Sequence, residues 1–209
     1  MARVSQEHLD ARRRQILDGA ALCFARNGFH ATSMQDVLKE VDLSAGAVYR
    51  YFSGKEELIG AIVAEVLDVV GGVFESAAGQ SPPPLPDEMI PRLLETLKEA
   101  RPGVVQDGQW IFPRLMLQVW TETLRNEDLA ELVHTGYARV RVAWVNVVEG
   151  YKAAGLISEE ADAEAMARVM IALAQGIAAQ MALFGEMPSE ILRDGLRAMT
   201  SMRDPRTRA

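Results

Sequence analysis

The stretch that decides the fold is residues 28–58, which read GFHATSMQDVLKEVDLSAGAVYRYFSGKEEL. Apolar residues recur at helical spacing in two places within it, so the sequence predicts two short helices. Thr32 or Ser33 can cap the first helix and Ser44 the second, because their hydroxyls accept the free N–H groups of a first turn. Two short helices joined by a tight turn are typical of a helix-turn-helix unit.

The flanking residues extend this unit to a small domain. Residues 6–27 show helical spacing and end at Gly28, which tolerates the left-handed conformation that follows a helix. Ser53 and Glu56 have the spacing of a capping box, which predicts the start of a long fourth helix. We expect the apolar faces of these helices to form one core. Its central residues should be Cys23, Phe24, Val48 and Phe52.

The second short helix has the composition of a helix that reads DNA. In a helix-turn-helix unit this helix presents its first residues to base edges in the major groove, while helix N-termini and side chains bind phosphates. Residues 44–46 are small, so they would let the backbone of this helix approach the DNA closely. Arg50 can contact a guanine with both guanidinium nitrogens, or a phosphate, although it can also be a solvated charge. Ser33 and Ser44 can equally be helix caps only.

Residues 12–60 resemble the DNA-binding domain of the tetracycline-repressor (TetR) family. The resemblance rests on Arg14-Gln15-Ile16-Leu17, Ala20-Ala21, Phe24, Gly28-Phe29, Ala31-Thr32-Ser33, Val37 and the run LSAGAVYRYFSGKEEL at residues 43–58. Two positions depart from the family pattern, since Leu38 replaces a small residue and Asp42 replaces glycine in the turn. The resemblance implies a phosphate contact for Tyr49. The predicted DNA contacts are Thr32, Ser33, Ser44, Ala45, Gly46, Tyr49, Arg50, Tyr51 and Lys55.

The rest of the chain predicts a larger helical domain, with a proline-rich loop at residues 79–86 and no alternating strand pattern. Further helices are expected near residues 87–101, 107–124, 127–153, 160–184 and 188–201. The fold class is therefore all-α, with about nine helices. We divide the chain into a DNA-binding domain at residues 1–55 and an effector-binding and dimerisation domain at residues 56–209.

Large aromatic and flexible side chains in the second domain are candidates for an effector pocket. For each of them alone, packing in a helical core is the ordinary interpretation, but as a set they suit an apolar cavity with a few polar anchors. No cluster of cations accompanies them, which disfavours a strongly anionic effector. The resemblance implies such a pocket, whereas the composition only permits it. The candidates are Trp110, Phe112, Met116, Trp120, His134, Tyr137, Trp144 and Gln175.

The helix expected at residues 160–184 is rich in alanine and carries no charge after Arg168. We interpret its uncharged run, Val169 to Gly185, as a buried helix and not as a membrane span, because it is short for one and contains glutamines. Small residues permit close helix packing, so this helix and the one at residues 188–201 are expected to form a homodimer interface.

Charge is distributed unevenly along the 209 residues. Residues 1–60 hold eight Lys or Arg and eight Asp or Glu, so the whole net charge of −7 falls on residues 61–209. The acidic balance therefore does not exclude DNA binding by the first domain. Only one cysteine is present, the first residues are no signal peptide, and the expected compartment is the cytoplasm.

The sequence thus predicts a ligand-responsive transcriptional regulator. It should act most simply as a repressor that binds a (pseudo)palindromic operator as a homodimer and responds to a small, largely apolar effector. An activator of the same fold, a helical protein–protein adaptor and an all-helical enzyme are the alternatives. No cofactor, metal site or catalytic residue is expected, since no metal-binding, nucleotide-binding or catalytic spacing is found.

Overall fold

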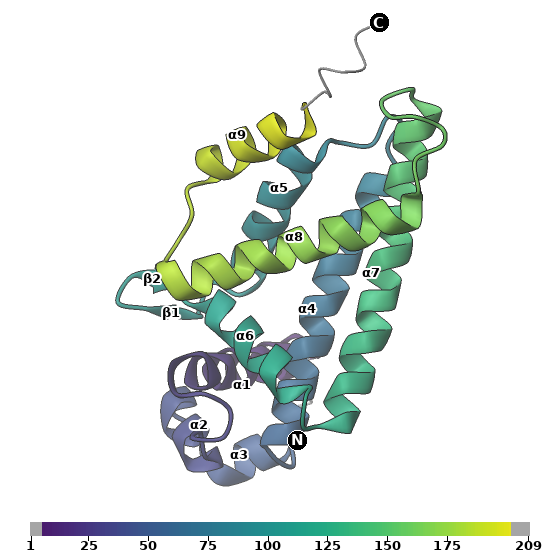
Figure 1. Ribbon diagram of the computed structural model, residues 1–209. Helices are drawn as coiled ribbons and strands as arrows, with labels where there is room; N and C mark the ends of the chain where they lie inside the picture. Colours follow the sequence, from purple (N-terminus) through teal and green to yellow (C-terminus); the bar gives the residue numbers. More distant parts are fainter. Residues whose placement is uncertain (1–5, 202–209) are drawn as a thin grey trace, which may run out of the picture.

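The computed structural model describes residues 6–201, and this part of the chain is mostly helical (Figure 1). The helices are α1 (Gln6–Asn27), α2 (Met34–Val41), α3 (Ala45–Tyr49), α4 (Lys55–Ala78), α5 (Pro86–Ala100), α6 (Phe112–Glu122), α7 (Glu127–Ala153), α8 (Ala163–Phe184) and α9 (Ser189–Thr200). Two short strands, β1 (Val105–Gln106) and β2 (Gln109–Trp110), lie between α5 and α6. The prediction of an all-α fold is confirmed, with nine helices over the described residues.

Helices α1, α2 and α3 form a small unit at one end of the molecule, which we call the head (Figure 1). The four residues expected in its core, Cys23, Phe24, Val48 and Phe52, are all buried, as predicted. Helix α4 starts at the head and continues without a break to Ala78. One helix therefore belongs both to the head and to the larger part of the molecule.

The turn of the helix-turn-helix unit depends on one residue in the left-handed region. Asp42 follows α2 with φ 51° and ψ 49°, and its backbone N–H donates to the last carbonyls of that helix. An aspartate adopts this conformation at modest cost, since it is one of the few residues other than glycine that visit it. The departure from glycine at this position therefore leaves the turn intact.

The cap of α2 is one of the two that were predicted, whereas the cap of α4 differs from the prediction by one residue. Ser33, and not Thr32, caps α2, and its hydroxyl accepts the N–H of Asp36 at 3.2 Å. The carboxylate of Asp36 accepts the N–H of Ser33 at 2.8 Å in return, which completes a capping box. At the start of α4, Ser53 donates to Glu57 instead of Glu56, because Gly54 is the N-cap and shifts the spacing by one residue.

The larger part of the molecule is a bundle around α4 and α7, which lie side by side (Figure 1). Phe74 of α4 and Trp144 of α7 are buried between them, with ring centroids 4.7 Å apart. Helix α8 crosses α6 and α7, and α9 packs on α5. This arrangement places α4, α5, α6, α7 and α8 around one interior.

The helix expected at residues 107–124 begins later than predicted. Residues 105–110 form an antiparallel hairpin in which Val105 pairs with Trp110 and Gln106 with Gln109. Asp107 and Gly108 both have positive φ, 51° and 76°, which is the geometry of a two-residue hairpin turn. The Asp-Gly pair was a turn signal in the sequence, but two-residue strands are too short to show alternation.

Helix α8 is the one helix of residues 6–201 whose length and composition would allow it to cross a membrane. Only 17% of the most apolar 18-residue stretch of α8 is buried within the single chain. The monomer alone therefore does not bury this helix on most sides, whereas the sequence predicted that it would be buried. One side packs on α6 and α7, while a stripe on the other side stays exposed. That stripe consists of Ala165, Val169, Ala172, Gly176, Gln180 and Leu183.

Candidate functional site

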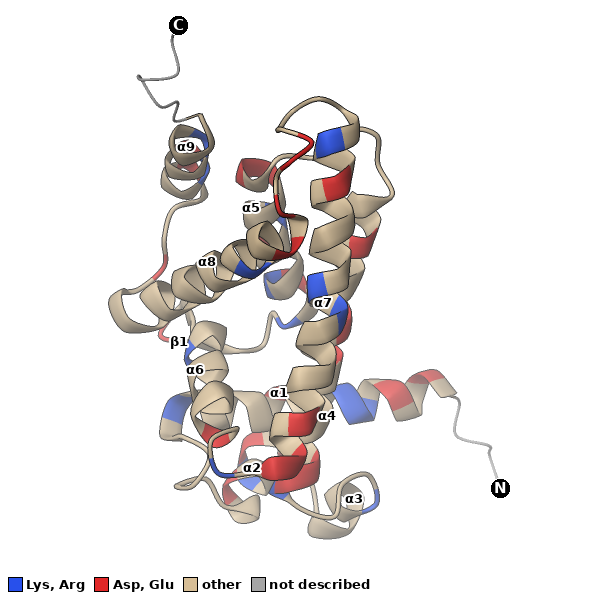
Figure 2. Ribbon diagram, turned by 45° about the vertical axis from the view of Figure 1, so that its right-hand side comes forward, with Lys and Arg blue, Asp and Glu red and all other residues tan. Residues whose placement is uncertain are grey.

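The start of α3 is an open surface. Ser44 caps the helix, and its hydroxyl accepts the N–H of Ala47 at 3.3 Å. Ala45 and Gly46 are exposed, and no heavy atom would lie within 4 Å of a Cβ placed on Gly46. Figure 2 shows α3 at the outer edge of the molecule, away from the bundle. No other part of the described chain covers this helix end, so a large partner molecule can reach it.

The residues that follow form a polar edge on the same side. Tyr49 is half exposed, and Arg50 is exposed with its guanidinium 5.9 Å from the ring centroid of the half-buried Tyr51. Within residues 6–201, Arg50 has no ion pair and no side-chain hydrogen bond. Its guanidinium donors are therefore available to an external acceptor.

Thr32 and Ser33 have different environments at the start of α2. Thr32 is buried, and its hydroxyl donates to the carbonyls of Gly28 and Cys23 at 2.8 and 3.2 Å, so it ties α2 to the end of α1. This geometry does not support the predicted DNA contact of the Thr32 side chain. Ser33 is exposed, and its hydrogen bonds hold the pKa of Asp36 below the ordinary value. Ser33 thus stays on the candidate surface.

Lys55 is held by the head itself. Its ammonium donates to the backbone carbonyls of Phe29, Thr32 and His30 at 3.0, 3.2 and 3.5 Å. It also lies 4.7 Å from the centroid of the Phe29 ring. These contacts join the start of α4 to the loop between α1 and α2. In this arrangement the three donors of the ammonium are already used, so a phosphate would have to compete with them.

A second link joins the head to the bundle through Arg101, which follows α5. This side chain is almost fully buried, and it binds Asp18 of α1 at 2.7 Å and also Glu65 of α4. Glu65 in turn binds Arg13 of α1, whose guanidinium lies 5.6 Å from the ring centroid of Phe52. On the other side of the head, His30 contacts the carboxylate of Glu122 at the end of α6 at 2.9 Å. Helices α4, α5 and α6 therefore all hold the head.

A cavity of about 110 Å³ lies inside the bundle, lined by residues of α4 to α8. Five of the predicted pocket residues line it. They are Met116, Trp120, Tyr137, Trp144 and Gln175. The remaining lining consists of alanine, phenylalanine and aliphatic side chains, and no lining residue is charged. The cavity is therefore lined mostly by hydrocarbon and has few polar groups.

Three predicted pocket residues lie elsewhere, which corrects the prediction. Trp110 and Phe112 stack on each other with ring centroids 5.3 Å apart, buried beside the hairpin and not on the cavity. His134 is exposed on α7. The helical period explains this, because Val133 and Tyr137 lie on the side of α7 that faces the cavity, and His134 points about 100° away from Val133 around the helix.

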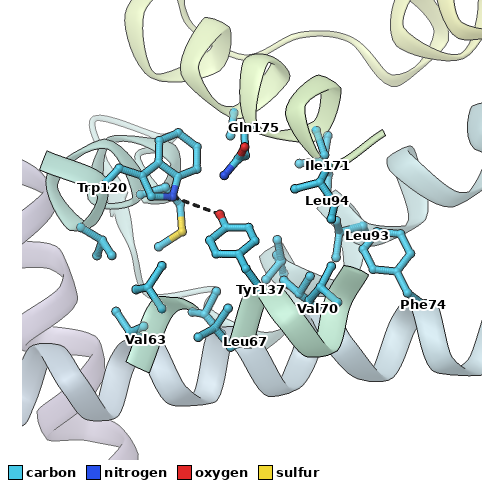
Figure 3. Close-up of a pocket in the computed structure, with 18 of the residues that line it drawn as sticks. Val63, Leu67, Val70, Phe74, Leu93, Leu94, Trp120, Tyr137, Ile171 and Gln175 are labelled. Carbon is cyan, nitrogen blue, oxygen red and sulfur yellow. Dashed lines mark hydrogen bonds between the residues drawn. The ribbon is translucent and has the colours of Figure 1, made fainter. Parts of the chain in front are cut away.

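The polar side chains of the cavity meet at one end (Figure 3). The indole N–H of Trp120 donates to the hydroxyl of Tyr137 at 3.1 Å, and Gln175 of α8 lies opposite this pair. No special signal in the sequence marks the α4 and α5 side chains that line the rest of the cavity. Val63, Leu67 and Leu94, for example, follow only the ordinary apolar pattern of a bundle helix.

Comparison with known proteins finds two matching family profiles. Residues 16–62 match bacterial regulatory proteins of the tetR family. Residues 90–203 match the C-terminal domain of BetI-type transcriptional repressors. The two profiles cover the head and most of the bundle.

Individual relatives agree with this assignment. The uncharacterized HTH-type transcriptional regulator YfiR of Bacillus subtilis is 44% identical over 66 residues, and the match spans 32% of each chain, about a third of that relative. The HTH-type transcriptional regulator UidR of Escherichia coli K12 is 26% identical over 188 residues, 90% of both chains. The structure of Salmonella enterica GusR has the same fold, with a TM-score of 0.70, 24% identity, and coverage of 96% of this chain and 100% of that chain.

The head, the turn and the bundle thus agree with both profiles. The second profile spans more than half of the 209 residues, and the chain belongs to the TetR family of bacterial transcriptional regulators.

Proposed function

We propose that this regulator is a repressor that binds a (pseudo)palindromic operator as a homodimer and leaves it when a small, largely apolar effector fills the cavity. The observation that carries the proposal is the course of α4. This helix packs into the head at its start, and its later residues line the cavity. A ligand that displaces α4 therefore changes the position of the head.

The exposed stripe of α8 supports the homodimer. Its residues recur at the spacing of one helix face, and most of them are small and apolar. Helix α9 presents Ile191, Gly195 and Ala198 in the same way. Association of these faces about a two-fold axis removes the apolar area from water in a four-helix interface.

Two heads on one dimer would each place α3 in a major groove. Half-sites would then lie about one helical turn, or a few turns, apart, and symmetry of the operator would follow from symmetry of the protein. Specificity would be shared between Arg50, contacts of the small residues 45–47 with thymine methyl groups, and DNA shape. An effector that favours the non-binding arrangement by about 1–3 kcal/mol would lower DNA affinity roughly 5- to 150-fold.

The alternatives to a repressor have less support. The C-terminal profile describes repressors, which favours repression over activation. Members of the family and the named relatives are regulators and not enzymes, and no group of three or more possible metal ligands occurs in the described part of the chain. We accordingly propose no catalytic role and no cofactor, and we place the protein in the cytoplasm with the DNA.

Selection of bound sequences from random DNA tests this function. The wild type should enrich a palindrome, and Ala172→Glu should disrupt the dimer because it places charges in the centre of the α8 stripe. Ala138→Glu, at an exposed position of α7, is the matched control. We expect Ala172→Glu alone to sediment as a monomer and to lose at least about tenfold in operator affinity. A wild type that enriches no sequence, or a dimeric Ala172→Glu variant, would contradict the proposal.

A further inference from the structure

Three polar side chains of the cavity gather at one end, and this asymmetry bears on the chemistry of its ligand. The buried indole N–H of Trp144, whose ring packs on Phe74, also has no hydrogen-bond partner within residues 6–201. Trp120, Tyr137 and Gln175 come from three different helices and meet at one end (Figure 3). Phe74, Leu93 and Ile171 lie toward the other end (Figure 3). A ligand that matches this lining has one polar group and an apolar remainder.

The polar end has hydrogen-bonding capacity that the protein does not use. The Tyr137 oxygen accepts the N–H of Trp120, so the hydroxyl proton of Tyr137 remains free to donate. This proton has no acceptor among residues 6–201, and within the same range the Gln175 amide has no hydrogen bond. In Figure 3 the Gln175 amide points toward the Trp120–Tyr137 pair. A ligand oxygen between them could accept from both groups.

The lining argues against a charged ligand. No Lys, Arg, Asp or Glu lines the cavity, so a buried carboxylate or ammonium would lose its hydration without gaining a counter-charge. Two of the four aromatic rings in the lining already pack on each other, since Trp144 is fully buried and its ring centroid lies 4.7 Å from that of Phe74. A neutral oxygen can instead be satisfied by hydrogen bonds alone.

We infer that the effector is an uncharged molecule with one terminal hydroxyl or carbonyl group and a hydrocarbon tail. The oxygen accepts hydrogen bonds from Tyr137 and Gln175, and the tail extends along α4 toward Phe74. This inference rests on the proposed function, in which the cavity is the effector site. Trp120 is a positioning residue here, since its N–H holds the Tyr137 hydroxyl in place.

Three compounds with the same tail and different head groups test this inference on the wild-type protein. They are hexanol, hexanoate and hexyltrimethylammonium, and their affinities can be measured by calorimetry or by the rise in Tm. We expect hexanol to bind at least about tenfold more tightly than either ion, because both ions must be desolvated without a partner. Equal or tighter binding of hexanoate or hexyltrimethylammonium would overturn the inference.

Two variants then test the anchors. Gln175→Leu removes an amide that has no partner in the described chain, so the variant should fold normally. Its affinity for hexanol should fall about fivefold, which is the net effect of one hydrogen bond. Tyr137→Phe should have a similar effect on hexanol. Tyr151→Phe is the matched control, because its hydroxyl binds the carbonyl of Pro84 outside the cavity. Unchanged hexanol affinity in Gln175→Leu would refute the assigned anchor.

Operator release is measured separately, so that the two proposals fail in different ways. If hexanol binds with the expected selectivity but leaves the DNA complex intact, the inferred ligand class is supported. The proposal that the effector releases the protein from DNA is then wrong. If the selected DNA is released by hexanoate and not by hexanol, the inferred ligand class is wrong while ligand-responsive regulation stands.

Discussion

The head and the bundle build their sites in different ways. In the head, the serines at helix starts bind residues three or four positions away, as in Ser33 with Asp36 and Ser53 with Glu57. In the cavity, Trp120, Tyr137 and Gln175 come from three helices, and their meeting depends on how α6, α7 and α8 pack. Local contacts can be read from spacing in the sequence, whereas contacts between distant helices cannot.

The two regions share one buried core and are also joined by specific polar links. Arg101 connects α5 to Asp18 and Glu65, and Lys55 connects α4 to the loop before α2. The lining residue Leu97 stands one helical turn before Arg101. A change in the cavity wall can therefore reach α1 through a short path.

The largest effect is expected at Arg101, because its removal breaks the link between the two regions. Arg101→Met leaves Asp18 and Glu65 close together without their shared cation. We expect a loss of about 3 kcal/mol in the free energy of unfolding, the lower end of the range for a buried pair, since both carboxylates are partly exposed. Urea unfolding measures this change.

Arg139→Met is the matched control for Arg101→Met. Arg139 also binds two carboxylates, Asp68 and Glu75 of α4, at 2.9 and 2.7 Å, but its side chain is half exposed. Surface pairs of this kind contribute about 0–1 kcal/mol. Similar losses in the two variants would show that Arg101 is no stronger a link than a surface pair.

The next effect concerns DNA reading by the head alone. Arg50→Ala should lower operator affinity by about 1–3 kcal/mol and relax the preference at one base pair of each half-site. Arg50 has no internal partner in residues 6–201, so the free energy of unfolding should stay unchanged. Arg193→Ala on α9 removes the same charge far from α3. Wild-type affinity in Arg50→Ala would disprove the assigned readout.

Lys55 tests whether one side chain can serve both regions. Lys55→Ala should lower the free energy of unfolding by about 1 kcal/mol, since its donors hold three carbonyls. If Lys55 also binds phosphate, operator affinity should fall on every DNA sequence, and the salt slope should fall by about one. Lys39→Ala, at an exposed position of α2, is the control. An unchanged slope with reduced stability would assign Lys55 to the head alone.

The smallest effect is expected at the cap of α2. Ser33→Ala should reduce stability by about 1 kcal/mol, the usual cost of losing an N-cap, while Ser76→Ala on the exposed side of α4 should have no such effect. The pH dependence adds a second readout. Hydrogen bonds from Ser33 lower the pKa of Asp36, so the capping box stabilises the fold above the unfolded pKa of about 4.

This contribution is lost as the pH falls through the lowered pKa of folded Asp36, because protonation removes the acceptor. Ser33→Ala removes the largest cause of the shift, so the loss of stability in acid should become shallower. Thermal unfolding from neutral to acidic pH measures both effects. The same acid sensitivity in wild type and Ser33→Ala would contradict this account of the capping box.

The accuracy of the sequence predictions follows the same division. The helices, the turn and the core of the head were predicted closely. Its errors are the capping partner of Ser53, which is Glu57 and not Glu56, and the exposure of Thr32, whose side chain is buried. In the bundle, the helical spacing of apolar residues located most helices but did not reveal the hairpin at residues 105–110. His134 was included in the pocket because of its chemistry, although its helical phase places it outside.

The sequence by itself determined the helices, the helix-turn-helix unit, the exposed polar edge around Arg50 and the apolar character of the second part. These features depend on spacing, caps and turn residues, which act within a few positions of the chain. The tertiary structure alone decided that Arg101 would bind α1 and α4, that Lys55 would bind three carbonyls, and that the polar groups of the cavity would meet at one end. Those contacts join residues far apart in the chain, and only the packing of the helices brings them within reach.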